Sequence, residues 1–183
     1  MLDVPTLPAS EIRSYIGDGL RNLMLRCLGG DEDHLDDAIK IFRLHYEQHL
    51  LDHTLLYPGI ERILLRQRRR EREMAILSNK PESFCRRILE GLGLASYFRI
   101  IAGGDTFPTR KPSPAPLLSM LTDLDCMAGD ACIVGDGPQD LQAGRAAGIS
   151  TCGVLWGYSS LATLQAESPT RILHNPESLD DWL

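Results

Sequence analysis

The chain has 183 residues, of which 43% are hydrophobic and 24% are charged, and its formal net charge is −6. This length suits one domain, or a core with a modest insertion, that buries most of the surface exposed by its unfolded form. The acidic balance argues against a general attraction to nucleic acid or to anionic membranes, and no stretch approaches the roughly 18 apolar residues of a membrane span. Residues 1–13 lack the basic start and apolar core of a signal peptide, so the sequence predicts a cytoplasmic protein of undetermined oligomeric state.

The first 57 residues have helical periodicity. Apolar residues recur at helical spacing between Ser10 and Gly29, and again from about Leu35 to Leu51. No strand-like alternation precedes Pro58, so residues 1–57 are predicted to form a small helical unit.

Residues 58–183 are predicted to form an α/β unit, because helices alternate with short apolar runs. This pattern is typical of a doubly wound parallel sheet with crossover helices. The helices are expected over Ile60–Arg70, Glu82–Leu92, Pro114–Leu124 and Leu141–Ala147, and the strands over Met74–Leu77, Ile100–Ala102, Ala131–Val134 and Thr151–Leu155.

Polar side chains follow the predicted strands. Ser78 and Asn79 come after the first apolar run, Lys111 precedes the third helix of this unit, and Asp136 and Asp140 follow the run that ends at Val134. Because the carboxyl ends of parallel strands meet at one edge of a sheet, these side chains are expected to lie together. A hydroxyl and a lysine bind phosphoryl oxygens, and carboxylates supply the oxygen ligands that Mg²⁺ prefers. The sequence therefore predicts a phosphate site over a divalent metal.

Each of these residues alone also has a purely structural interpretation. Ser78 and Asn79 could cap the following helix, Asp140 could be a first-turn carboxylate favoured by the helix dipole, and Lys111 could be a solvated loop residue. Their joint occurrence at successive strand ends favours the functional interpretation.

Three segments carry a resemblance to a known family. "AILSNK", "GGDTFPTRKPSPAPLL" and "IVGDGPQDLQAGRAAGISTCGVLWGY" resemble the second, third and fourth motifs of the haloacid dehalogenase-like hydrolase superfamily. Their flanks most resemble the bacterial phosphoglycolate phosphatases. "EIRSYIGDGLRNLMLRCL" and "HYEQHLLDHTLLYPGIERIL" are similar to the helical cap of that family, so the resemblance covers nearly the whole chain. It implies a cap at residues 1–57 and a Rossmann-like hydrolase core at residues 58–183.

The resemblance also implies roles for single residues. Ser78 would hydrogen-bond the phosphoryl group with the backbone N–H of Asn79 nearby, and Lys111 would neutralise charge on that group and on the nucleophile. Asp136 would ligate Mg²⁺, and Asp140 would support the metal through water or an adjacent hydrogen bond. Gly137 stands where the family usually has serine.

Two interpretations of the turn at Gly17, Asp18 and Gly19 stay open. Caps of this type turn a loop toward the active site here, so the turn could touch the carboxylate end of the substrate. It could equally be a plain interruption of a helix.

The family's nucleophile lies in an Asp-x-Asp-Gly-Thr segment after the first core strand, and no segment of this chain matches it. The sequence is therefore expected to begin inside the cap and to lack the central strand of the sheet. Asp3, Asp31 and Asp105 are the remaining nucleophile candidates.

Three further features favour structural interpretations. "RQRRRERE", residues 66–73, contains two glutamates and is expected to be a solvated helix face rather than a nucleic-acid site. His45, His49 and His53 share a helical spacing, but no cysteine or carboxylate accompanies them at a metal-site spacing. The five cysteines have no paired spacing and are expected to be buried, reduced thiols.

The leading functional hypothesis is a Mg²⁺-dependent phosphomonoesterase for a small phosphorylated acid, with 2-phosphoglycolate as the favoured substrate and an aspartyl-phosphate intermediate. One alternative is another sugar-phosphate phosphatase or phosphomutase of the same family. A phosphoacceptor signalling domain would need an aspartate ahead of Ser78 on its own strand end, which the sequence lacks. The third alternative is a truncated, non-catalytic chain.

Overall fold

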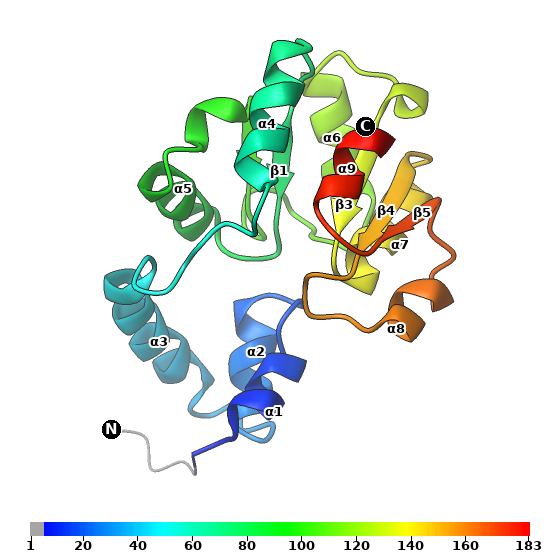
Figure 1. Ribbon diagram of the computed structural model, residues 1–183. Helices are drawn as coiled ribbons and strands as arrows, with labels where there is room; N and C mark the ends of the chain where they lie inside the picture. Colours follow the sequence, from blue (N-terminus) through cyan, green and yellow to red (C-terminus); the bar gives the residue numbers. More distant parts are fainter. Residues whose placement is uncertain (1–5) are drawn as a thin grey trace.

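A computed structural model describes residues 6–183 and shows helices above and below short parallel strands (Figure 1). The helices are α1 (Ala9–Ser14), α2 (Leu20–Cys27), α3 (Leu35–His49), α4 (Ile60–Arg69), α5 (Glu82–Gly91), α6 (Ala115–Asp123), α7 (Pro138–Ala146), α8 (Leu161–Ala166) and α9 (Glu177–Trp182). The strands are β1 (Ala75–Leu77), β2 (Ile100–Ala102), β3 (Cys132–Gly135), β4 (Ser150–Val154) and β5 (Arg171–Leu173). Two 3₁₀ turns, Ala95–Tyr97 and Ala128–Asp130, precede β2 and β3. The predicted mixed α/β fold with parallel strands is confirmed.

The N-terminal helices α1, α2 and α3 lie below the strands in Figure 1. The first of the two predicted helices is in fact α1 and α2, separated by a turn at residues 15–19. Gly17 has φ +130° and Gly19 has φ +86°, values that favour glycine over residues with a side chain. These two glycines end the first helix, which the apolar spacing alone could not reveal.

The strands form two parallel sheets. One contains β1 and β2, with Ala75 opposite Ile100, and the other has the order β3-β4-β5, with Cys132 opposite Ser150. The sequence analysis expected one parallel sheet that lacks its central strand, and the described strands fall into two separate sheets. Within residues 6–183, β1 has no strand partner on the side opposite β2, and β3 has none on the side opposite β4.

Two apolar clusters stabilise the core. One lies around α7 and contains Leu117, Ile133 and Ala143. The other joins α4, β4 and the C-terminal segment through Ile63, Val154 and Leu179. The short elements after residue 155, namely α8, β5 and α9, are absent from the predicted pattern.

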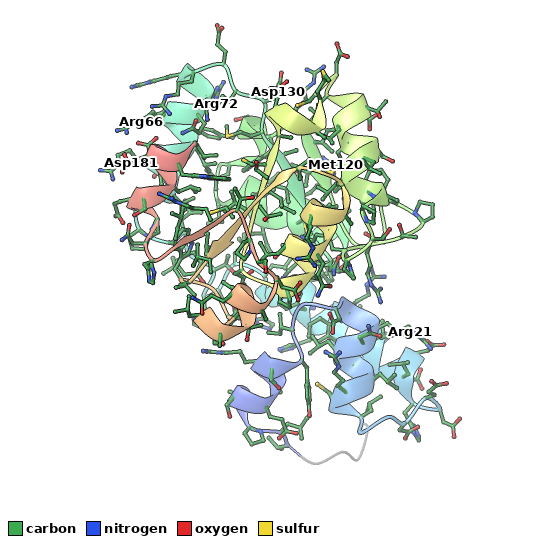
Figure 2. The ribbon with its side chains drawn as sticks, turned by 90° about the vertical axis from the view of Figure 1, so that its right-hand side faces the viewer. Arg21, Arg66, Arg72, Met120, Asp130 and Asp181 are labelled. Carbon is green, nitrogen blue, oxygen red and sulfur yellow. The ribbon has the colours of Figure 1, made fainter. Side chains whose placement is uncertain are left out.

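The basic stretch at residues 66–73 is not only a solvated face. Gln67 is 2% exposed, and its amide donates to Asp180 Oδ1 at 3.2 Å. Arg66 pairs with the same carboxylate, and Figure 2 shows α4 and α9 side by side where Arg66 and Asp181 are labelled. This stretch therefore fastens α4 to α9, and the expectation of a purely solvated face is wrong for Gln67.

The cysteines of the described chain are free thiols, but only two of them are buried. Cys85 and Cys152 are buried, whereas Cys132 is exposed. The expectation of buried thiols is therefore wrong for Cys132. None of the helices within residues 6–183 combines the length and apolarity needed to cross a membrane.

Candidate active site

The turn after β1 places Ser78 at the end of that strand. Its N–H donates to Ala102 O at 3.0 Å, which extends the pairing of β1 with β2 by one residue. Its Oγ accepts the N–H of Lys80 at 3.1 Å, which closes a tight turn ahead of α5. The hydroxyl is therefore held at the carboxyl end of β1.

The side chain of Asn79 connects three segments that are distant in sequence. Its Nδ2 donates to Gly17 O and to Lys111 O, each at 2.9 Å, and the residue is 8% exposed. Asn79 Oδ1 has no hydrogen-bond partner within residues 6–183. The sequence analysis considered Asn79 as a helix cap or as a backbone N–H donor, because no sequence spacing indicates that its amide joins a cap turn to the lysine loop.

Lys111 is buried at the same strand end. Its ammonium group donates to Leu77 O and lies 2.6 Å from Asp140 Oδ1. The side chains of the pair are 9% and 8% exposed, respectively. The alternative of a solvated loop lysine is therefore wrong.

Asp140 lies in the first turn of α7, which begins at Pro138 rather than at Leu141. While Oδ1 faces Lys111, Oδ2 accepts the N–H of Gly137 at 3.0 Å. A carboxylate that caps the first turn in this way is also favoured by the helix dipole. Asp140 thus caps the helix and pairs with the lysine at the same time.

Asp136 follows β3 directly. Its Oδ2 accepts the N–H of Tyr158 at 2.9 Å, and Oδ1 has no hydrogen-bond donor among the described residues. A Cβ at Gly157 would overlap the Asp136 side chain, so only glycine allows this close approach. The sequence analysis missed Gly157, although it lies in the quoted segment "GVLWGY".

The carboxyl ends of β1 and β3 thus present a hydroxyl, a buried ammonium group and two carboxylates. Lys111 bridges the two sheets, because it contacts the last carbonyl of β1 and a carboxylate of α7. An ammonium group beside a hydroxyl can neutralise and hold a tetrahedral anion. Asp136 offers a carboxylate oxygen of the kind that hard divalent cations prefer.

The turn at Gly17, Asp18 and Gly19 lies against this region. Gly17 O accepts from Asn79, and a Cβ at Gly17 would lie 2.5 Å from Gln139 Nε2. Asp18 itself pairs with Arg26, with 2.5 Å between Oδ2 and Nη2. The turn is close to the candidate site, but its carboxylate is already bound to a cation.

The remaining nucleophile candidates lie elsewhere or outside the described residues. Asp31 pairs with His34 at 2.7 Å, and Asp105 accepts the N–H of Glu82 at 2.7 Å. Asp3 lies outside the described residues. Within residues 6–183, neither Asp31 nor Asp105 forms a hydrogen bond or an ion pair with Ser78 or Lys111.

The spaced histidines form no metal cluster in the part of the chain that the structure describes. His45 and His49 have ring centroids 4.4 Å apart, and His49 Nδ1 lies 2.6 Å from Asp52 Oδ2. A neighbouring carboxylate accounts for the orientation of His49.

Comparison with known proteins identifies the family. The model of the haloacid dehalogenase-like hydrolases matches residues 1–154. The chain belongs to the haloacid dehalogenase-like hydrolase family. This result confirms the predicted membership and the predicted hydrolase class.

Several relatives of this chain are named phosphoglycolate phosphatase. The chain is 35% identical to the protein of that name from Chromobacterium violaceum over 173 residues, which are 91% of this chain and 78% of the relative. The protein from Aquifex aeolicus is 36% identical, with 92% and 77% covered. The protein from Pseudomonas putida is 34% identical over 96% of this chain, which spans only 66% of that relative's length.

Solved structures confirm the fold. A predicted phosphoglycolate phosphatase from Haemophilus somnus superposes with a TM-score of 0.92 at 23% identity, covering 99% of this chain and 85% of that one. A putative β-phosphoglucomutase from Thermotoga maritima has a TM-score of 0.71 at 18% identity, with 96% and 82% covered. At these identities the likeness establishes the architecture and leaves the substrate to be argued from the site.

Proposed function

We propose that this hydrolase provides the phosphate-binding and metal-binding groups of a Mg²⁺-dependent phosphomonoesterase that acts in the cytoplasm. The proposed reaction converts 2-phosphoglycolate to glycolate and inorganic phosphate. The observation that carries this proposal is the buried Lys111 ammonium group, 2.6 Å from Asp140 and in contact with the end of β1 beside Ser78. The names of the relatives support the choice of substrate.

In the proposed site, Ser78 and the backbone N–H of Asn79 bind phosphoryl oxygens. Lys111 stabilises the negative charge of the phosphoryl group as it moves between oxygens. Asp140 keeps the ammonium group oriented, because its other oxygen is fixed to the start of α7. These residues bind and orient the phosphoryl group. The attacking aspartate would be a residue other than Asp140.

The residues present fit a bound Mg²⁺. Asp136 Oδ1 is not engaged by a hydrogen-bond donor of the described chain, while Oδ2 is fixed by Tyr158. Mg²⁺ commonly takes one or two carboxylates and keeps several waters, so a cluster of three protein ligands is unnecessary. Asp136 would be the direct ligand, and Asp140 would act through the outer shell. A bound Mg²⁺ would supply charge stabilisation for the phosphoryl oxygens.

The two unpaired strand edges suggest where the nucleophile enters. In the family this chain resembles, the first core strand is central and carries the attacking aspartate at its end. A strand placed between β1 and β3 would bring that carboxylate beside Ser78, Lys111 and Asp136. We propose this position for the nucleophile.

The test is a phosphate-release assay with 2-phosphoglycolate and Mg²⁺. The 183-residue chain is compared with a fusion that carries, at its N-terminus, a strand followed by the Asp-x-Asp-Gly-Thr segment that the family resemblance implies. We expect turnover from the fusion and its loss in the fusion with Lys111→Met. A fusion that folds but retains full activity after Lys111→Met would refute the proposed site.

A further inference from the structure

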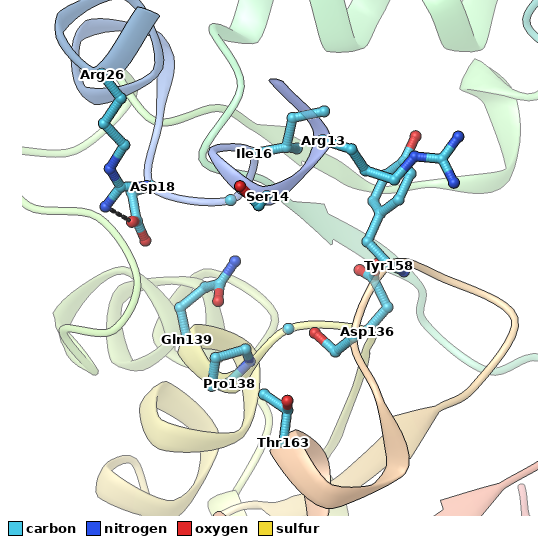
Figure 3. A pocket seen from close by; sticks show the side chains of 13 residues that line it. Arg13, Ser14, Ile16, Asp18, Arg26, Asp136, Pro138, Gln139, Tyr158 and Thr163 are labelled. Atoms are coloured by element: carbon cyan, nitrogen blue, oxygen red, sulfur yellow. Dashed lines mark hydrogen bonds and ion pairs between the residues drawn. The ribbon is translucent and has the colours of Figure 1, made fainter. Parts of the chain in front are cut away.

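A cavity of about 290 Å³ lies between the N-terminal helices and the start of α7 (Figure 3). Asp136 and Gln139 line it from the strand side, and Arg13, Asp18 and Arg26 line it from the helical side. The cavity opens beside the carboxylate proposed to bind Mg²⁺. A small molecule bound at that carboxylate would therefore extend its other end into the cavity.

The two arginines of this cavity differ in their partners. Arg26 pairs with Asp18 at 2.5 Å and donates to Tyr15 O at 3.2 Å, so its charge is already neutralised. Arg13 forms no ion pair with the residues that the structure describes. Its guanidinium carbon lies 5.6 Å from the centroid of the Tyr158 ring. Arg13 is thus an available cation held over an aromatic face.

Tyr158 connects this cation to the proposed metal ligand. Its backbone N–H donates to Asp136 Oδ2 at 2.9 Å, and its ring lies beside Arg13 (Figure 3). Asp136 and Arg13 therefore contact the same residue, Tyr158, and line the same cavity. A molecule that binds at Asp136 and enters this cavity would come close to Arg13.

We propose that Arg13 is the specificity-determining residue that binds the carboxylate of a short phosphorylated acid. This inference rests on the proposed function and assigns the end of the substrate opposite the phosphoryl group. A guanidinium group can bind a carboxylate through two parallel hydrogen bonds, which a neutral hydroxyl cannot match. Asp18 would repel the same carboxylate, and its contribution is to hold Arg26.

The experiment measures dissociation constants of the 183-residue chain by calorimetry in the presence of Mg²⁺. The probes are 2-phosphoglycolate, inorganic phosphate and 2-hydroxyethyl phosphate, which has a similar length but no carboxylate. The variants are Arg13→Gln, Arg13→Lys and, as a matched control, Arg21→Gln. Arg21 lies in the helical layer (Figure 2), outside the cavity, and pairs with Asp36 at 3.5 Å.

We expect Arg13→Gln to weaken 2-phosphoglycolate binding about 10-fold, the scale of a hydrogen bond to a charged group. Binding of phosphate and of 2-hydroxyethyl phosphate should change less than about two-fold, since neither carries a carboxylate for Arg13 to bind. Arg13→Lys should retain part of the preference because it keeps the charge but loses the planar fork. Arg21→Gln should leave all three constants unchanged.

Equal weakening of all three probes by Arg13→Gln would overturn the inference, because it would place Arg13 at the phosphoryl end or in the fold. No change for 2-phosphoglycolate would overturn it as well. In both cases phosphate binding by the unaltered chain would leave the proposed function standing. If the unaltered chain bound none of the probes, both the proposed function and this inference would fall.

Discussion

The pair of Lys111 and Asp140 offers a direct test of the site because it couples stability to the proposed chemistry. Replacing Asp140 with alanine removes the carboxylate that faces the ammonium group at 2.6 Å. The lysine would keep only Leu77 O as a described partner, and Gly137 N–H would lose its acceptor. The variant thus leaves a buried charge without its counter-ion.

The magnitude follows from the burial of the pair. Both side chains are less than a tenth exposed, so solvent cannot replace the lost partner. Removing one member of a buried ion pair typically costs about 3–5 kcal/mol in the free energy of unfolding, against a total of about 5–15 kcal/mol for an ordinary domain. Lys111→Met should cost a similar amount. The double variant Lys111→Met/Asp140→Leu should cost much less than the sum, because neither charge then remains buried.

The assay is urea denaturation followed by tryptophan fluorescence. Trp156 and Trp182 pack against the cluster around Ile63, so both should report loss of the core. The surface control is Asp36→Ala, whose carboxylate is 94% exposed, and it should cost less than about 1 kcal/mol. Costs below about 1 kcal/mol for both single variants, or an additive double variant, would refute the reasoning.

Three further expectations can be checked separately. Asp136→Asn should weaken Mg²⁺ binding more than Asp140→Asn, because only Asp136 is a proposed direct ligand. Equal, negligible effects of both variants in metal titrations would contradict the assignment of Asp136 as a metal ligand. Gly157→Ala should both lower the melting temperature and weaken Mg²⁺ binding, since the added methyl group would displace the Asp136 carboxylate. An unchanged Mg²⁺ titration would contradict the link between Gly157 and Asp136. Burial raises the pKa of Cys152 to about 12 and also raises that of Cys132, but only Cys132 has an exposed side chain. Cys152 should therefore be alkylated more slowly than Cys132 at pH 8 in the native chain, and equal labelling rates by peptide mass analysis would count against the buried position.

The sequence predicted the parallel α/β elements well because each has a strong local signal. Strand β2 lies over the predicted residues, and α3 and α4 each agree within two residues. The helix α7 begins three residues earlier than predicted, since Pro138 is favourable in a first turn and the apolar pattern starts only at Leu141. Local patterns therefore locate elements better than they locate their ends.

Long-range polar contacts could not be predicted in this way. The spacing placed Lys111 and Asp140 near the same sheet edge. It gave no sign that the Lys111 side chain is buried between Asp140 and the end of β1. The division of the strands into two sheets is likewise a property of pairing rather than of any one strand. The sequence thus indicated the chemical groups of the site, and only the structure shows how they are held.

The buried amide of Asn79 connects the N-terminal turn to the lysine loop. It binds the carbonyl of Lys111 on one side and the carbonyl of Gly17 on the other. A shift of the N-terminal turn would therefore disturb the loop that carries the lysine, because one rigid side chain joins both. Gly17 also packs against Gln139 at the start of α7, so the turn contacts both halves of the site. The segment that lines the cavity is thus physically connected to the residues proposed to bind phosphate. If the cavity binds a ligand, we expect the ligand to stabilise the lysine loop through the same contacts.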